Sequence, residues 1–171
     1  LAANSHIVLA DVWVELVQMT LTLCHEQDFR HIVSPGATQQ GLSLMAGGLT
    51  AERATIMVLR RGMEDASWDR IQPSIQPLIQ KVEAVRQQLI DLAEAWLELV
   101  QKTRSLCHDH DYRHIVSPRA TQQGLSLMVG GLTAEGATIM VLRRGMEDTS
   151  WGRIRPSIHP LVLKVEVARQ Q

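Results

Sequence analysis

Apolar and small residues recur every three or four positions along residues 7–24, the spacing that lines one face of an α-helix. This stripe consists of Leu9, Val12, Trp13, Leu16, Val17, Thr20, Leu23 and Cys24. The same stripe returns along residues 92–106. No segment alternates apolar and polar residues as a half-buried strand would. The pattern therefore predicts an all-α fold of packed helical bundles.

Two shorter helices are predicted in the middle of this pattern. Ser34-Pro35 is typical of a helix start, and Gly47-Gly48 is typical of a helix end. Thr50 then caps a third helix, which ends at Arg60-Arg61-Gly62. Residues 54–59 also have the length and branching of a buried strand, but the signals on both sides favour a helix.

A short fourth element is expected from Asp65 or Ser67 to Ile71, with an interruption at Pro73. Ser74 would cap the next helix. Its apolar pattern then continues without Gly or Pro, so one helix is predicted from about residue 75 to 107. A break near Gln87-Gln88 is the alternative. A shared helix would fix two units as a rigid pair, or would permit helix exchange between molecules and so a homo-oligomer.

The chain repeats itself with a period of 83 residues, as in Trp13 and Trp96 (96 − 13 = 83). Without gaps, residues 11–88 and 94–171 are identical at 58 of 78 positions. We interpret this as a tandem duplication of a four- to five-helix unit. The predicted units are residues 6–88 and 89–171, with residues 1–5 as a flanking segment.

The differences between the two copies are unevenly distributed. Only three of the 20 fall in residues 30–65, namely Gly36/Arg119, Ala46/Val129 and Arg53/Gly136. One interpretation is chance after a recent duplication. The other is that the middle segment performs the same task twice.

Composition narrows the class of protein. Of the 171 residues, 45% are hydrophobic and 20% are charged, which is typical of a folded chain. No apolar run is long enough to span a membrane, and no leader is visible. With only two cysteines, a disulfide scaffold is excluded and an intracellular, cytoplasmic location is favoured. A net charge of −1 disfavours nucleic acid as a partner.

Cysteine and histidine cluster once in each copy. The candidate metal ligands are Cys24, His25, His31, Cys107, His108 and His114. Thiolate and imidazole bind zinc, but the spacing matches no standard finger, and a buried cysteine is the alternative. Cys24, His31 and Asp28 are also the residue types of an activated thiol, although proximity in sequence does not establish the geometry. We therefore predict no catalytic residue, no cofactor and no committed metal site, with a metal- or small-ligand-binding protein as an alternative function.

Residues 38–61 resemble a helix-turn-helix, since a glycine, an apolar residue and a capping Thr follow a polar start. The resemblance implies DNA binding as a second alternative. Against it, Leu44 and Leu127 occupy a position that normally holds a small residue, and Glu52 lies on the helix that would read the bases. An αα-hairpin within a bundle is the other interpretation.

The remaining candidates belong to a protein-binding surface. We predict partner-binding residues at Arg60, Arg61, Trp68, Arg143, Arg144 and Trp151. Arginine is favoured at interfaces, but paired arginines at a helix C-terminus also compensate the helix dipole. The two tryptophans either anchor a partner or, as we favour, lock the fourth element onto the bundle. The methionines are assigned mainly to the core, although Met-rich grooves do accept partner helices.

Together these observations predict a non-enzymatic, tandem helical interaction or scaffold module with a protein partner. It would present two near-identical surfaces, around residues 30–65 and 113–148, at a spacing fixed by the shared helix. Two weak sites on one chain gain avidity without new contacts.

Overall fold

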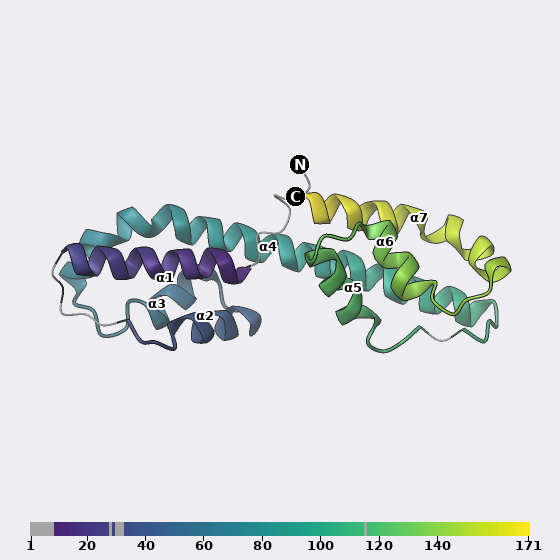
Figure 1. Ribbon diagram of the computed structural model, residues 1–171, viewed down its shortest axis with the longest axis horizontal. Coiled ribbons are helices and arrows are strands. Elements are labelled where there is room, and N and C mark those ends of the chain that lie inside the picture. The colour runs from purple at the N-terminus through teal and green to yellow at the C-terminus, as the bar shows by residue number, and fades with distance from the viewer. Residues whose placement is uncertain (1–8, 28, 30–32, 115) are drawn as a thin grey trace. The chain divides into compact units, whose positions relative to one another are not determined.

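The computed structural model describes residues 9–27, 29, 33–114 and 116–171, and every regular element within them is a helix (Figure 1). In chain order the elements are α1 (Leu9–Glu26), α2 (Ala37–Ala46), α3 (Ala51–Val58), α4 (Asp65–Asp109), α5 (Ala120–Val129), α6 (Ala134–Ala137), the π-helix η2 (Thr138–Leu142) and α7 (Asp148–Gln170). The predicted all-α class is confirmed.

The helices form two compact units, a first unit over Ile7–Gln87 and a second unit over Gln88–Gln171. The 45-residue α4 belongs to both (Figure 1). Its N-terminal part is the last helix of the first unit, and its C-terminal part is the first helix of the second. The predicted shared helix is therefore confirmed, and it is continuous through Gln87 and Gln88.

Local signals account for most of the helix ends. The hydroxyl of Thr50 accepts a hydrogen bond from the backbone N–H of Arg53 at 3.2 Å and so starts α3, as predicted. Gly48, with a φ of +106°, follows α2 in the left-handed region where glycine is favoured. Helix α2 starts at Ala37, later than expected, because Ser34 caps a preceding turn by accepting from Gly36 N–H at 3.2 Å.

The predicted interruption at Pro73 is wrong, because α4 runs unbroken through Pro73 and Pro77. Each proline removes one N–H donor and leaves the carbonyl four residues earlier without its helical partner. Those carbonyls belong to Asp69 and Pro73. Both residues are exposed, so water can solvate the carbonyls. Helix α7 contains Pro156 and Pro160 in the same arrangement.

Each unit is built around one fully buried tryptophan, as predicted for Trp13 and Trp96. The indole N–H of Trp96 donates to the carbonyl of Ala120 at 3.1 Å, and this bond ties α4 to the start of α5. In the first unit Trp13 donates to Ala37 at 3.2 Å. The buried ring therefore also satisfies its one polar group.

A second tie joins the last helix of each unit to the start of the third. In the second unit, the Glu166 carboxylate accepts from the first N–H of α6, that of Ala134, at 2.7 Å. Such N–H groups have no partner within their own helix. Hydrogen bonds from Arg169 lower the pKa of Glu166, and the bond from Ala134 adds to this effect. Glu83 accepts from Ala51 at 2.9 Å in the same way in the first unit.

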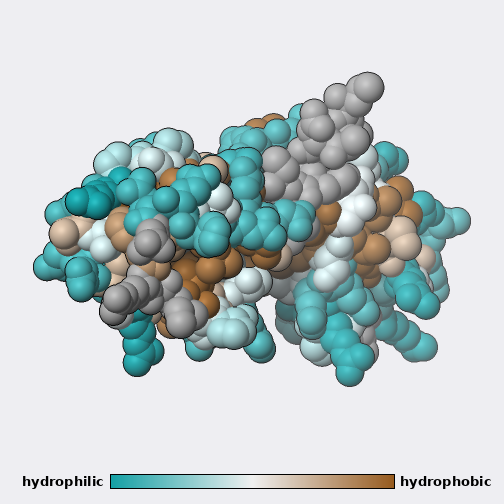
Figure 2. Space-filling model, turned by 60° about the vertical axis from the view of Figure 1, so that its left-hand side comes forward, coloured by the Kyte–Doolittle hydropathy of each residue, from teal (hydrophilic) through white to brown (hydrophobic). Residues whose placement is uncertain are grey.

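Not all large apolar side chains are in the cores. Figure 2 shows hydrophobic residues reaching the surface between hydrophilic ones. The large hydrophobic residues that the structure leaves exposed are Met19, Leu21, Ile56, Met57, Leu97, Ile139, Met140, Leu163 and Val167. Across the described part of the chain, no helix is both long and apolar enough to span a membrane.

Candidate functional site

The segment that differs least between the two copies folds as a helical hairpin in each unit. In the second unit, a turn at Gly131 (φ +113°) separates α5 from α6. The hydroxyl of Thr133 accepts from Gly136 N–H at 3.0 Å and caps α6. Gly136 replaces Arg53, and here the regular α3 of the first unit becomes the short α6 followed by the π-helix η2. π-turns of this kind are frequent at functional sites.

An open groove of about 410 Å³ lies between α5 and η2. We call it the α5–η2 groove. Its apolar lining consists of Leu127, Met140 and Val141, and its polar lining consists of Gln122, Gln123, Ser126 and Arg144. Grooves with an apolar lining and a few polar groups are the usual form of a peptide-binding surface.

The first unit carries the same side chains at the equivalent positions of α2 and α3. They are Gln39, Gln40, Ser43, Leu44, Met57, Val58 and Arg61, all identical to their counterparts. The exposure of the two methionines is also matched, since Met57 is 52% exposed and Met140 is 54% exposed, whereas Val58 is buried and Val141 is partly exposed. The chain therefore presents one set of potential binding groups twice.

Four of the six predicted partner-binding residues make contacts with one another within their own unit. The guanidinium of Arg143 pairs with Asp148 at 2.7 Å and lies 5.6 Å from the ring centroid of Trp151. Trp151 itself is only 6% exposed. This contact fastens the start of α7 to the end of η2. Arg60 and Trp68 make the equivalent contacts in the first unit, with Asp65 as the acid.

The other two predicted residues, Arg61 and Arg144, are exposed. Neither forms an ion pair with any residue that the structure describes. Arg144 lines the α5–η2 groove, and Arg61 holds the equivalent position in the first unit. The structure thus separates each arginine pair into a structural member and a surface member.

Among the residues that the structure describes, the candidate metal ligands do not form a cluster. Within the described residues, no three of the His, Cys, Asp and Glu side chains are placed to hold a metal ion. Cys24 and Cys107 are free and buried, and burial raises the pKa of both thiols. His114 has its Nε2 3.0 Å from the carbonyl of Leu142.

The other candidate histidines that the structure describes complete no metal site. His25 and His108 are exposed at the ends of their helices. His31 and Asp28 lie outside the described residues. Whether His31 could join Cys24 and His25 as a metal ligand therefore stays a prediction from the sequence.

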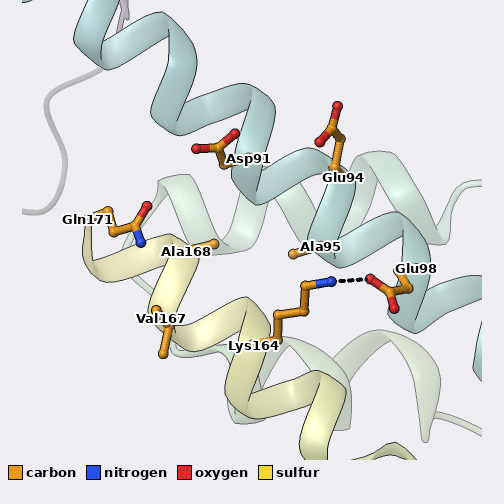
Figure 3. Close-up of a pocket in the computed structure, with 8 residues that line it drawn as sticks. All are labelled: Asp91, Glu94, Ala95, Glu98, Lys164, Val167, Ala168 and Gln171. Carbon is orange, nitrogen blue, oxygen red and sulfur yellow. Dashed lines mark hydrogen bonds and ion pairs between the residues drawn. The ribbon is translucent and has the colours of Figure 1, made fainter.

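A second hollow, of about 390 Å³, lies between α4 and α7 and is rich in carboxylates (Figure 3). Figure 3 shows Lys164 reaching from α7 to Glu98 on α4, at 2.6 Å. Lys81 and Glu15 make the same bond in the first unit at 3.1 Å. Since this pair joins two helices in both units, its role is structural, and we place the candidate site in the α5–η2 groove.

Sequence reasoning assigned the methionines mainly to the core and did not single out the glutamines of the groove. Met45, Met63, Met128 and Met146 are buried, in keeping with the core assignment, but Met57 and Met140 are more than half exposed. The available signal was the low divergence of residues 30–65, which include every first-unit counterpart of the groove. Periodicity alone does not distinguish these methionines, because they neighbour buried positions on the same short helix.

Comparison with known proteins gives no further assignment. No family model, no curated protein and no solved structure matches this chain.

Proposed function

We propose that this protein is a non-enzymatic interaction module that binds protein segments through two near-identical surfaces. One surface is the α5–η2 groove, and the other is formed by the equivalent residues of α2 and α3. The observation that carries the proposal is the exposure of Met57 and Met140 within sets of seven identical side chains. Burial of an exposed apolar side chain is the main source of binding energy at such surfaces.

Two copies of one surface also suggest a mechanism. A partner that carries two matching segments binds the second site as an intramolecular step, at a high effective concentration. Each single contact can then be weak and rapidly reversible. The module would favour partners with repeated segments or twofold symmetry over partners with a single segment.

DNA binding has less support. The helix that would enter a DNA groove exposes Ile56, Met57 and Glu52 in the first unit. Sequence readout relies mainly on hydrogen-bonding side chains at base edges, and a glutamate repels the phosphate backbone. These side chains suit an apolar protein segment better than a duplex.

The test is a selection from a displayed library of random peptides about 16 residues long, enough for four helical turns. The full chain serves as bait. Enriched peptides are then measured against the double variant Met57→Glu/Met140→Glu. The matched control is Met19→Glu/Leu163→Glu, which places the same charges at exposed apolar positions outside the two surfaces.

We expect enriched peptides to bind wild type and control equally and to bind the Met57→Glu/Met140→Glu variant at least about tenfold more weakly. Two copies of a selected peptide joined in tandem should bind wild type more tightly than they bind Met57→Glu alone or Met140→Glu alone, because each single variant keeps only one of the two surfaces. Circular dichroism confirms that each variant is folded. The proposal fails if no peptide is enriched, or if the enriched peptides bind the double variant as well as they bind wild type.

A further inference from the structure

We infer that the segment bound by each surface is an acidic amphipathic helix, with a carboxylate about one turn from its apolar side chains. This inference rests on the proposed function and names the chemistry of the partner. It follows from the shape of the α5–η2 groove, from its single charge and from the spacing of the groups that line it.

Shape and lining favour a helix as the occupant. The groove lies between two helical elements, with Leu127 on α5 facing Met140 and Val141 on η2 across it. A hollow between two packed helices accepts the ridge of a third helix. Methionine suits this use because its flexible thioether adapts to differently shaped apolar partners.

Charge identifies the polar group that the occupant carries. Among the described residues, Arg144 is the one charged residue that lines the groove, and it forms no ion pair with any of them. Its neighbour Arg143 is already paired with Asp148. A guanidinium beside an apolar groove is best matched by a carboxylate, which it can bind through two parallel hydrogen bonds. Arg61 offers the same group in the first unit.

The rest of the polar lining is neutral. Gln122, Gln123 and Ser126 both donate and accept hydrogen bonds, so they tolerate many polar groups without adding charge. A nucleic acid would require several cations along its backbone, whereas the groove provides one. The lining therefore favours a protein segment with one well-placed acid over a polyanion.

Spacing sets the position of that acid. Met140 lies in η2 and Arg144 in the turn that directly follows it, and both line the same groove. Because the two residues share one groove of about 410 Å³, an occupant that covers Met140 with an apolar side chain would meet Arg144 within about one turn of its own length. The expected motif is two apolar residues three or four positions apart, followed or preceded by Asp or Glu within one turn.

The experiment repeats the peptide selection on the charge-reversal variant Arg61→Glu/Arg144→Glu. Wild type should enrich peptides that carry Asp or Glu beside the apolar pair. The charge-reversal variant should enrich Lys or Arg at the same place. The matched control, Arg70→Glu/Arg153→Glu, reverses two other exposed arginines and should select the wild-type motif.

Selected peptides then give the affinity. Replacing the enriched Glu by Gln should weaken binding to wild type about tenfold and have little effect on the charge-reversal variant. Groove-dependent peptides with no acidic preference, unchanged on the reversal variant, would overturn the inference and leave the proposed function standing. Peptides that bind the Met57→Glu/Met140→Glu variant undiminished would overturn the proposed function itself.

Discussion

Trp96 packs directly against Gly124. A Cβ atom added to Gly124 would lie 2.0 Å from Cζ2 of the Trp96 ring, far inside van der Waals contact. Gly41 has the same relationship to Trp13 in the first unit. Each glycine is in the middle of a helix, where it lowers helix stability, so its presence is explained by the ring that occupies the space of its side chain.

We therefore predict that Gly124→Ala destabilises the second unit by about 3 kcal/mol, because the buried ring must move. Urea or thermal unfolding followed by circular dichroism measures the change. Gly152→Ala is the matched control, since Gly152 is in α7 with nothing within 4 Å of its added Cβ. That control should stabilise the protein by about 0.5–1 kcal/mol through helix propensity. Equal effects of the two substitutions would contradict the packing argument.

Replacing the two arginines of a pair should change the stability of the protein by different amounts. Arg143→Ala removes both the ion pair with Asp148 and the contact with Trp151, so we expect a loss of about 1 kcal/mol. Arg144→Ala should change stability by less than about 0.5 kcal/mol, because it makes neither contact. Thermal unfolding of both variants provides the test. An Arg144 variant that is as unstable as the Arg143 variant would show that Arg144 also has a structural role.

Sequence patterns predicted the helices well, since apolar spacing and caps are local properties. Thr50 is an example, because its capping bond reaches only three residues along the chain. The prolines of α4 misled the prediction for a different reason. Whether Pro73 breaks a helix depends on whether the orphaned carbonyl faces solvent, and that depends on which face of α4 packs against the unit.

The candidate site was predicted only in outline. The low divergence of residues 30–65 pointed to the segment in which we place the candidate site, but the residue types drew attention to Trp68 and Arg60. Both are held in an intramolecular contact that periodicity does not reveal. Exposure of Met57 is likewise a tertiary property, because it depends on where the neighbouring helices leave the surface uncovered.

The side chain of Tyr112 carries a polar group whose removal should stabilise the second unit. Its hydroxyl is buried and has no hydrogen-bond partner among the described residues, and the equivalent residue of the first unit is Phe29. Since a buried, unpaired hydroxyl is unfavourable, Tyr112→Phe should stabilise the protein by about 1 kcal/mol. The ring stacking on His110, at a centroid distance of 5.3 Å, is retained. A lower midpoint in urea for this variant would mean that the hydroxyl is satisfied after all.

The last prediction concerns acid stability and Glu166. Hydrogen bonds from Arg169 hold the pKa of Glu166 below its ordinary value in the folded chain. A carboxyl with a depressed folded pKa stabilises the protein above its unfolded pKa of about 4.3, and this contribution is lost as the pH falls through the folded pKa. At neutral pH, Glu166→Gln should therefore cost about 1–2 kcal/mol, because Arg169 and the N–H of Ala134 lose a charged acceptor.

Below about pH 4 the difference between wild type and Glu166→Gln should shrink, because the wild-type carboxyl becomes neutral as well. Melting temperatures measured from pH 7 to pH 3 would follow this convergence. Glu83→Gln, which removes the equivalent carboxylate of the first unit, should behave in the same way. Parallel curves for wild type and variant across the whole range would contradict the assignment, since they would mean that the ionised carboxylate adds no stability.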